Sequence, residues 1–397
     1  MLLKQILLAR HSFKDSIATM GFDLTLYLHY LILIAIAAAA AAAIMPLVKL
    51  IAVKFDIVAH PGGRRIHKKP TPEIGGAGIL FGIVVAGIAQ LSFEHFFGWP
   101  GFLSDARLSL VNIIAIAGGV LIIYLTGLID DIVDLTPGLK LTGQTAGAVV
   151  VAIWGVSIDF LPNPFGGPNF GLDPVLSTII TAFYLVAFAN IINLIDGMDG
   201  LAAGITAIAA TSLMFLATDV NQISAAIIAA LLVGACLGFL PYNFNPASIF
   251  MGDQGALLLG FLLGIISLMG VMKTTAAIAL AVPLLIVAIP IVDTFSAIVR
   301  RIRGKRSIKD ADKGHLHHRL VRTGLSVRQT VAVVYLWSVL LAVGAYVVRA
   351  TPTTVRGIAL VALLVVTALI AWMLGLFKVA DHGDRSPRAK RAEKPEE

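Results

Sequence analysis

The segment at residues 175–200, VLSTIITAFYLVAFANIINLIDGMDG, decides how this chain folds. Its first part is apolar, and a helix needs about 20 such residues to cross a bilayer. Its last part gathers two amides and two carboxylates, Asn190, Asn193, Asp196 and Asp199. Polar groups left unpaired in hydrocarbon are costly, so this cluster predicts a functional site at the membrane boundary. Gly197 and Gly200 predict that the helix ends there, and the alternative interpretation is a solvated helix cap.

The composition places the whole chain in the membrane. Of its 397 residues, 58% are hydrophobic and only 13% are charged, and the mean hydropathy is +0.91. Membrane β-strands would alternate over about ten residues, whereas these apolar runs have helical length, so we predict an all-α polytopic membrane protein. The single cysteine, Cys236, excludes a disulfide framework and a cysteine metal site. The net charge of +7 indicates membrane topology rather than nucleic-acid binding.

About eleven apolar runs are long enough to be membrane helices. They cover residues 26–52, 75–92, 109–129, 141–160, 175–193, 201–217, 223–242, 254–272, 276–299, 328–349 and 356–377. We predict an external N-terminal segment at 1–23 and a transmembrane catalytic domain at 24–378. The charged, proline-containing stretch at 379–397 is predicted to be a disordered cytoplasmic tail.

The distribution of lysine and arginine predicts the orientation of the chain. The segments that follow odd-numbered runs hold 22 of the 30 Lys and Arg residues. Cytoplasmic loops carry the excess of these residues in membrane proteins. The N-terminus is therefore predicted to lie outside the cell and the C-terminus in the cytoplasm.

Polar clusters gather on this predicted cytoplasmic side. They cover residues 64–76, 130–134, 190–199, 251–255 and 314–319. A transporter would place its acids near the bilayer midplane, where Asp293 is the candidate. Because the clusters share one rim instead, the pattern favours an enzyme that works at the inner membrane face.

The residue types in these clusters suit phosphate chemistry. Mg²⁺ is held by one or two carboxylates together with water and substrate phosphates, and Mn²⁺ could replace it. Asp130 and Asp134 are four residues apart and would share a helix face, while the side chain between them at Asp131 points about 100° away. Basic loops would neutralise an anionic substrate. Three histidines could bind phosphate or transfer protons, and their spacing disfavours zinc: His315, His317 and His318.

Together these motifs resemble the polyprenyl-phosphate N-acetylhexosamine-1-phosphate transferase superfamily, over the first ten apolar runs. The matching motifs are Pro-x-x-Gly-Gly from Pro72, Asp-Asp from Asp130, Asn-x-x-Asn-x-x-Asp-Gly-x-Asp-Gly from Asn190, Met-Gly-Asp-x-Gly from Met251 and Pro-x-x-Asp from Pro290. MraY-like members carry three consecutive histidines. The sequence His-Leu-His-His-Arg from His315 is instead similar to the WecA/TagO-like members.

The resemblance implies a reaction and its partners. Polyprenyl phosphate of the undecaprenyl type would attack UDP-N-acetylglucosamine and release UMP, in the first membrane step of a cell-envelope polysaccharide such as lipopolysaccharide or teichoic acid. The site would face the cytoplasm from a bacterial cytoplasmic (inner) membrane, and a homodimer is left open. Within the family, the alternatives are transfer of phospho-N-acetylmuramoyl-pentapeptide or of another phospho-N-acetylhexosamine. Outside it, the alternatives are a cation-coupled transporter and a prenyltransferase that uses the Asp-Asp-x-x-Asp motif.

The resemblance also implies residue roles. Asp130 would be the base that deprotonates the lipid phosphate, and Asp131 would lie beside it, paired with Lys140. The implied catalytic set is Asp130, Asp131 and Asp253, and the implied metal ligands are Asn193 and Asp253. The implied substrate-binding set is Lys68, Lys69, Lys140, Asn190, Asp196, Asp199, Asp293, Arg300, Arg301, His315, His317 and His318, in which Asp196 and Asp199 line the nucleotide site.

Overall fold

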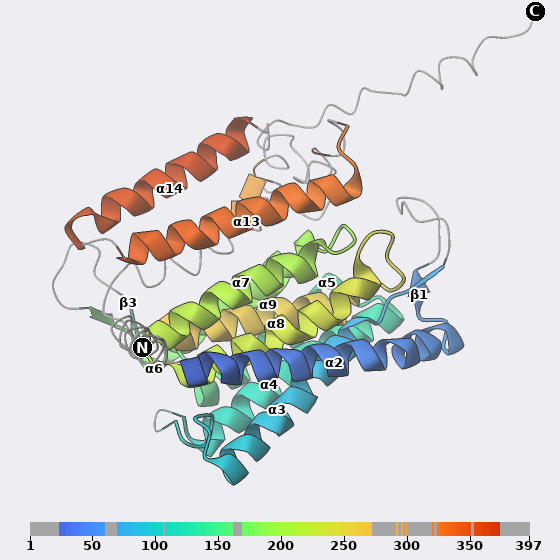
Figure 1. Cartoon of the computed structure of the whole chain (residues 1–397), viewed down its shortest axis with the longest axis horizontal. Coiled ribbons are helices and arrows are strands. Elements are labelled where there is room, and N and C mark those ends of the chain that lie inside the picture. The colour runs from blue at the N-terminus through green and yellow to red at the C-terminus, as the bar shows by residue number, and fades with distance from the viewer. Residues whose placement is uncertain are drawn as a thin grey trace, which may run out of the picture.

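The described part of the protein is a bundle of helices (Figure 1). The computed structural model describes residues 24–59, 70–105, 108–161, 169–271, 291–292, 295–296, 299, 320, 324–350 and 353–373. The helices are α2 (Leu24–Lys54), α3 (Gly76–Phe97), α4 (Leu110–Val133), α5 (Pro137–Val150) with a π-helical turn (Val151–Gly155), α6 (Pro174–Ile195), α7 (Leu201–Asp219), α8 (Ile223–Asn243), α9 (Gly252–Val271), α13 (Val327–Ala350) and α14 (Thr353–Met373). The chain therefore folds as the all-α polytopic protein that the composition predicts.

Two small β-hairpins are the exception to the all-α prediction. Strand β1 (Val58–Ala59) pairs antiparallel with β2 (Thr71–Pro72), and β3 (Phe160–Leu161) pairs antiparallel with β4 (Phe170–Gly171). Each strand has two residues, which is too short to leave a signal in the apolar pattern. Both hairpins lie in connections between helices and leave the helical architecture unchanged.

Eight of the described helices are long and apolar enough to cross a membrane. They correspond to the predicted runs 1 to 3, 5 to 8 and 10. The predicted run at 141–160 is different, because α5 begins earlier, at Pro137, and has only 14 residues before the π-helical turn. Run 11 forms α14, of which the apolar part within the described residues is Ile358–Ile370, and most of run 9 lies outside the described residues. The number eleven, the orientation of the termini and the segments at 1–23 and 379–397 remain predictions.

Capping residues explain where α4, α5 and α6 begin. Thr136 caps α5, with proline at the next position, and Asp173 caps α6 in the same way. Proline fits the first helical position because its missing N–H has no partner there in any case. Ser109 and Asn112 form a reciprocal capping box at the start of α4. These caps fix the first residue of α4, α5 and α6, and so the position of every later residue along each helix.

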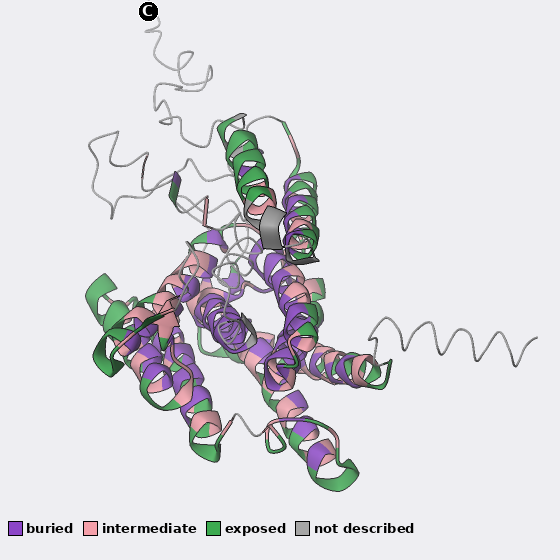
Figure 2. Ribbon diagram, turned by 90° about the vertical axis from the view of Figure 1, so that its left-hand side faces the viewer, coloured by how far each residue is buried: buried purple, intermediate pink, exposed green. Residues whose placement is uncertain are grey.

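Helix α9 is the centre of the bundle. Its side chains are buried from Gln254 to Met269, and α3, α4, α6, α7 and α8 all pack against it. Figure 2 shows the buried residues in the middle of the bundle and the exposed residues on its outer helices. A helix that is apolar on all sides needs such a position. The residues at the start of α9 are therefore held from several directions at once.

Small residues let the other helices approach closely. A Cβ atom added at Gly238 of α8 would lie 2.9 Å from Ala41 of α2. A Cβ atom added at Gly127 of α4 would lie 2.5 Å from the nitrogen of Gln254, at the start of α9. Neither helix pair can keep this distance with a larger residue at these positions. The end of α4 is consequently pressed against the first turn of α9.

Candidate active site

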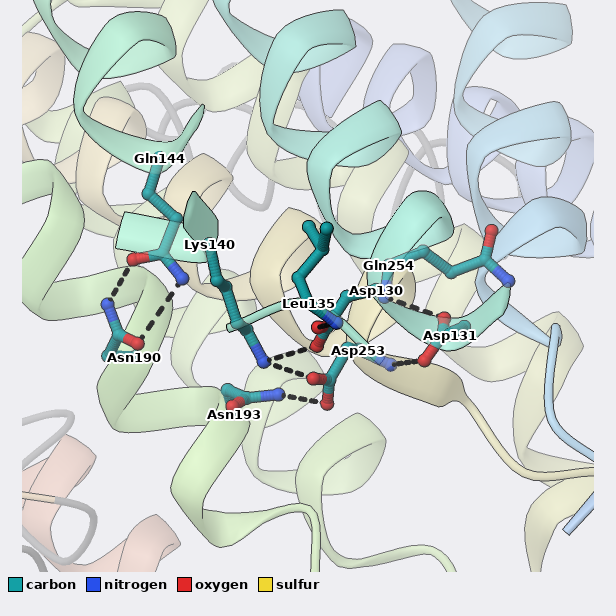
Figure 3. Close-up of polar contacts among 9 residues, drawn as sticks. All are labelled: Asp130, Asp131, Leu135, Lys140, Gln144, Asn190, Asn193, Asp253 and Gln254. Atoms are coloured by element: carbon teal, nitrogen blue, oxygen red, sulfur yellow. Dashed lines mark hydrogen bonds and ion pairs between the residues drawn. The ribbon is translucent and has the colours of Figure 1, made fainter. Parts of the chain in front are cut away.

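Asp253, the second residue of α9, is the meeting point of the polar side chains (Figure 3). Its Oδ2 forms a short ion pair with Lys140 of α5, and its Oδ1 accepts a hydrogen bond from Asn193 Nδ2 of α6 at 2.7 Å. Lys140 Nζ also lies 2.9 Å from Asp130 Oδ2 of α4. Four helices thus bring together two carboxylates, one amine and one amide. Two of the contacting residues, Lys140 and Asp253, are 113 residues apart in the sequence.

Asp131 has a different position from the one predicted. Its two carboxylate oxygens accept hydrogen bonds from the backbone nitrogens of Asp253, at 2.7 Å, and Gln254, at 3.1 Å. Free N–H groups at a helix start favour a negative charge, so this contact stabilises the first turn of α9. The predicted pairing of Asp131 with Lys140 is wrong, because Lys140 pairs with Asp130 and Asp253. Asp131 therefore positions Asp253 through the backbone.

The end of α4 also differs from the prediction, which placed Asp130 and Asp134 on one helix face. The helix stops at Val133, and Asp134 follows in the left-handed region with φ of 53°. Asp134 thus leaves the helical course, and the predicted shared face of Asp130 and Asp134 is not formed. Asp130 Oδ1 instead accepts the backbone N–H of Leu135 at 2.9 Å. This bond turns the chain toward Thr136 and the start of α5, which places Lys140 beside Asp130.

The cluster is open on the side of Asp253. The side chain of Asp253 is 35% exposed, compared with 18% for Lys140 and 11% for Asp130. A ligand can therefore reach Asp253 while Asp130 and Lys140 lie behind it. An ammonium between two carboxylates offsets part of their mutual repulsion. Lys140 consequently reduces the repulsion that two acids and an anionic ligand would otherwise experience.

Asp196 ends α6 close to this cluster. Its burial, together with the negative charges of Asp253, Glu73 and Asp199, raises the pKa of Asp196 to about 7. The helix break at Gly197 and Gly200 is present as predicted: α6 ends at Ile195, and Gly200 has φ of 80°. A positive φ costs glycine little, so Gly200 can turn the chain into the start of α7. The break leaves Asp196 at the end of α6, near Asp253 and Asp199.

Asp199 and Asn190, both predicted to bind substrate, have partners within the chain. Asp199 Oδ2 accepts bonds from Asn245 Nδ2, at 2.9 Å, and from the backbone of Ala247, at 3.0 Å. These bonds hold the connection between α8 and α9. Asn190 pairs with Gln144 of α5. Their substrate contacts remain predictions, and the structure gives both residues a bracing role.

Hydrogen bonds join α13 to the backbone at Gly200 and Asn245, next to the site. Asn243 Oδ1 accepts the backbone N–H of Gly200 at 2.9 Å, and the Tyr335 hydroxyl of α13 donates to the Gly200 carbonyl. Arg328 Nε donates to the Asn245 carbonyl at 2.8 Å. The start of α13 is thereby fixed to the same connections that Asp199 holds.

The site also contains residues that the sequence motifs did not reveal. Gln144 is 1% exposed and Gln254 is fully buried, with no partner for its side-chain amide among the described residues. Gln144 lies four residues after Lys140, so helical spacing from a recognised site residue was the available signal. Gln254 occupies the unspecified position of the Met-Gly-Asp-x-Gly motif, so the motif gave no signal for it.

Several predicted site residues lie outside the described residues. They are Lys68, Lys69, Asp293, Arg300, Arg301, His315, His317 and His318. Their substrate contacts remain predictions. Within the described part, Asp130, Asn193 and Asp253 are brought together, and Lys140 joins them through Asp130 and Asp253 instead of through Asp131.

The described residues fit a magnesium ion that also binds substrate phosphates. They hold no group of three or more His, Cys, Asp or Glu side chains that could bind a metal alone. Lys140 shows, however, that Asp130 and Asp253 lie close enough to share one cation. Asn193 can present its amide oxygen by rotation of the amide. One or two carboxylates and an amide oxygen suffice for Mg²⁺ when phosphates and water supply the other ligands.

Comparison with known proteins is consistent with this chemistry. The sequence profile of glycosyl transferase family 4 matches residues 113–271, which run from the first turn of α4 to the end of α9. The chain is 34% identical to a probable undecaprenyl-phosphate N-acetylglucosaminyl 1-phosphate transferase of Bacillus subtilis, over 84% of this chain and 88% of the relative. It is 37% identical to the decaprenyl-phosphate N-acetylglucosaminephosphotransferase of Mycolicibacterium smegmatis, over 81% and 84%. It is 33% identical to a phospho-N-acetylmuramoyl-pentapeptide-transferase of Desulforamulus reducens, over 75% and 87%.

Proposed function

The chain belongs to glycosyl transferase family 4, among the polyprenyl-phosphate hexosamine-1-phosphate transferases, and we propose that it transfers N-acetylglucosamine 1-phosphate from UDP-N-acetylglucosamine to a polyprenyl phosphate. An oxygen of the lipid phosphate attacks the β-phosphorus of the nucleotide sugar. The bond from that phosphorus to the bridging oxygen breaks, so that UMP leaves and polyprenyl-diphosphate-N-acetylglucosamine forms. The observation that carries this proposal is the convergence of Asp130, Lys140 and Asn193 on Asp253.

Each residue of the cluster has a different role in the proposed reaction. Asp130 accepts the proton of the lipid phosphate, which frees the attacking oxygen, and the Lys140 ammonium 2.9 Å away favours the ionised form of Asp130 that this step needs. Lys140 lowers the repulsion between the two anionic substrates. Asp253 and Asn193 would hold Mg²⁺, which supplies charge neutralisation to the transferred phosphoryl group. Asp131 keeps the first turn of α9 in place, and Asp196 borders the site.

The location of the reaction follows from two observations. The cluster lies at the ends of membrane helices, where a lipid phosphate in the headgroup layer is accessible. The excess of lysine and arginine on that side supports a site that faces the cytoplasm. We therefore propose a multi-pass protein of a bacterial cytoplasmic membrane, whose water-soluble substrate arrives from the cytoplasm.

Release of UMP tests the proposal directly. The purified full-length protein is supplied with undecaprenyl phosphate, Mg²⁺ and each of three donors: UDP-N-acetylglucosamine, UDP-N-acetylgalactosamine and UDP-N-acetylmuramoyl-pentapeptide. We expect UMP with the first donor, none after addition of EDTA, and none from Asp253→Asn. UMP with the muramoyl donor alone would assign the chain to the other substrate class, and no UMP with any donor would refute the transferase proposal.

A further inference from the structure

Two amide side chains form a closed pair between α5 and α6, behind the catalytic cluster. Asn190 Nδ2 donates to Gln144 Oε1 at 2.6 Å, and Gln144 Nε2 donates to Asn190 Oδ1 at 3.4 Å. Asn190 Nδ2 also donates to the Val186 carbonyl at 2.8 Å. Both hydrogens of the Asn190 amide and its oxygen are therefore engaged within the protein. Asn190 has little bonding capacity left for a substrate, which argues against its predicted substrate contact.

The pair is placed to control two residues of the cluster. Gln144 follows Lys140 by four residues on α5, and Asn190 precedes Asn193 by three residues on α6. Residues at these spacings lie on one face of a helix, one turn apart. Lys140 and Asn193 both contact Asp253, from opposite helices. The amide pair thus joins α5 and α6 one helical turn away from the point where these helices meet Asp253 (Figure 3).

From this arrangement we propose that Gln144 and Asn190 are positioning residues for the transfer reaction, which hold Lys140 and Asn193 against Asp253. The proposal rests on the proposed function. Lys140 has a flexible four-carbon stem, and α5 is a short helix at the border of the bundle with many exposed residues. A reciprocal amide pair fixes both the distance and the rotation of α5 relative to α6. Gln144 is buried, so a polar partner is required in any case.

Loss of the pair should act on turnover more than on substrate binding. When Gln144 is replaced by methionine, the volume is retained but Asn190 loses both bonds to it. Lys140 then moves relative to Asp253, and misplacement of a group by about 1 Å can cost about 100-fold in rate. A positioning role predicts a lower kcat with little change in the KM for the nucleotide sugar. A substrate contact at Asn190 predicts a higher KM instead.

A set of five proteins tests the proposal: wild type, Gln144→Met, Asn190→Leu, the exchanged double variant Gln144→Asn with Asn190→Gln, and Thr145→Ala. Thr145 is the matched control, because it is exposed on α5 and its hydroxyl donates to the Leu141 carbonyl of the same helix. UMP release gives kcat and KM, and thermal unfolding in detergent shows whether each variant is folded. The exchanged variant keeps one long and one short amide, so it can rebuild the pair.

We expect both single variants to lose about 10- to 100-fold in kcat, with KM within about 3-fold of wild type. The exchanged variant should recover most of the lost kcat, and Thr145→Ala should equal wild type. The proposal is overturned if Asn190→Leu raises KM at unchanged kcat, or if the folded exchanged variant is no better than the single variants. Should a single variant fail to fold, the exchanged variant and Gln144→Asn make the same comparison. An inactive wild type would refute the proposed function itself, which this series distinguishes from loss of the amide pair.

Discussion

The carboxylate of Asp131 offers the sharpest test of how the site is built. It accepts two backbone hydrogen bonds at the start of α9, at 2.7 and 3.1 Å. Asp131→Asn keeps one acceptor oxygen but turns an NH₂ group toward a backbone N–H at the start of α9. A buried hydrogen-bonding group left without a partner costs about 1–3 kcal/mol. The substitution should therefore lower the free energy of unfolding by about 1–3 kcal/mol.

The assay compares Asp131→Asn with wild type by thermal unfolding in detergent and by UMP release. We expect a lower unfolding temperature and a lower kcat together, because the first turn of α9 and Asp253 move when the carboxylate no longer holds them. Normal unfolding with complete loss of turnover would refute this reasoning, since it would show that Asp131 itself acts on the substrate. Normal values of both would show that the two backbone bonds contribute nothing to the site.

Three further substitutions give separate expectations. Asp130→Asn should abolish UMP release and leave the unfolding temperature near that of wild type, whereas substantial turnover would remove Asp130 as the base. Gly127→Ala should lower both stability and kcat, because the new Cβ would lie 2.5 Å from the Gln254 nitrogen; Gly118→Ala on the same helix, where a Cβ meets nothing within 4 Å, is the control. Asp196 has a pKa of about 7, raised from 3.8, so its ionisation destabilises the fold increasingly as pH rises from about 4 to about 7. Asp196→Asn should therefore stabilise the protein more at pH 8 than at pH 5, by at most about 3 kcal/mol, and an equal gain at both values would contradict the raised pKa.

Residue patterns in the sequence predicted the helices and the members of the cluster. The apolar run before Asn190 became α6, and the glycines that follow it became the expected helix break. Asp130, Asn193 and Asp253 lie at the ends of different apolar runs, and the shared membrane side was enough to predict that they come together. The burial of Cys236 also agrees with its place in an apolar run.

The contacts between these residues could not be predicted in the same way. Lys140 was expected to pair with Asp131, but the partner depends on how α4 ends. The left-handed turn at Asp134 and the bond from Leu135 to Asp130 set the start of α5, and neither has a sequence signal of its own. The role of Gln144 depends on which face of α5 meets α6. Tertiary packing determines these contacts, and the local pattern of residues in one sequence does not specify it.

The shortness of α5 has a consequence for the lipid around the enzyme. From Lys140 to the exposed Trp154, the chain advances about 21 Å at 1.5 Å per residue, whereas the hydrocarbon of a bilayer is about 30 Å thick. Lysine and tryptophan both prefer the interface, so these two side chains mark the upper and lower borders that α5 can cover. We expect the bilayer to thin beside α5, which relieves the mismatch at a cost of fractions of a kcal/mol per Å. Such thinning would bring the headgroup layer closer to Lys140, and so to Asp130 and Asp253, which both contact it.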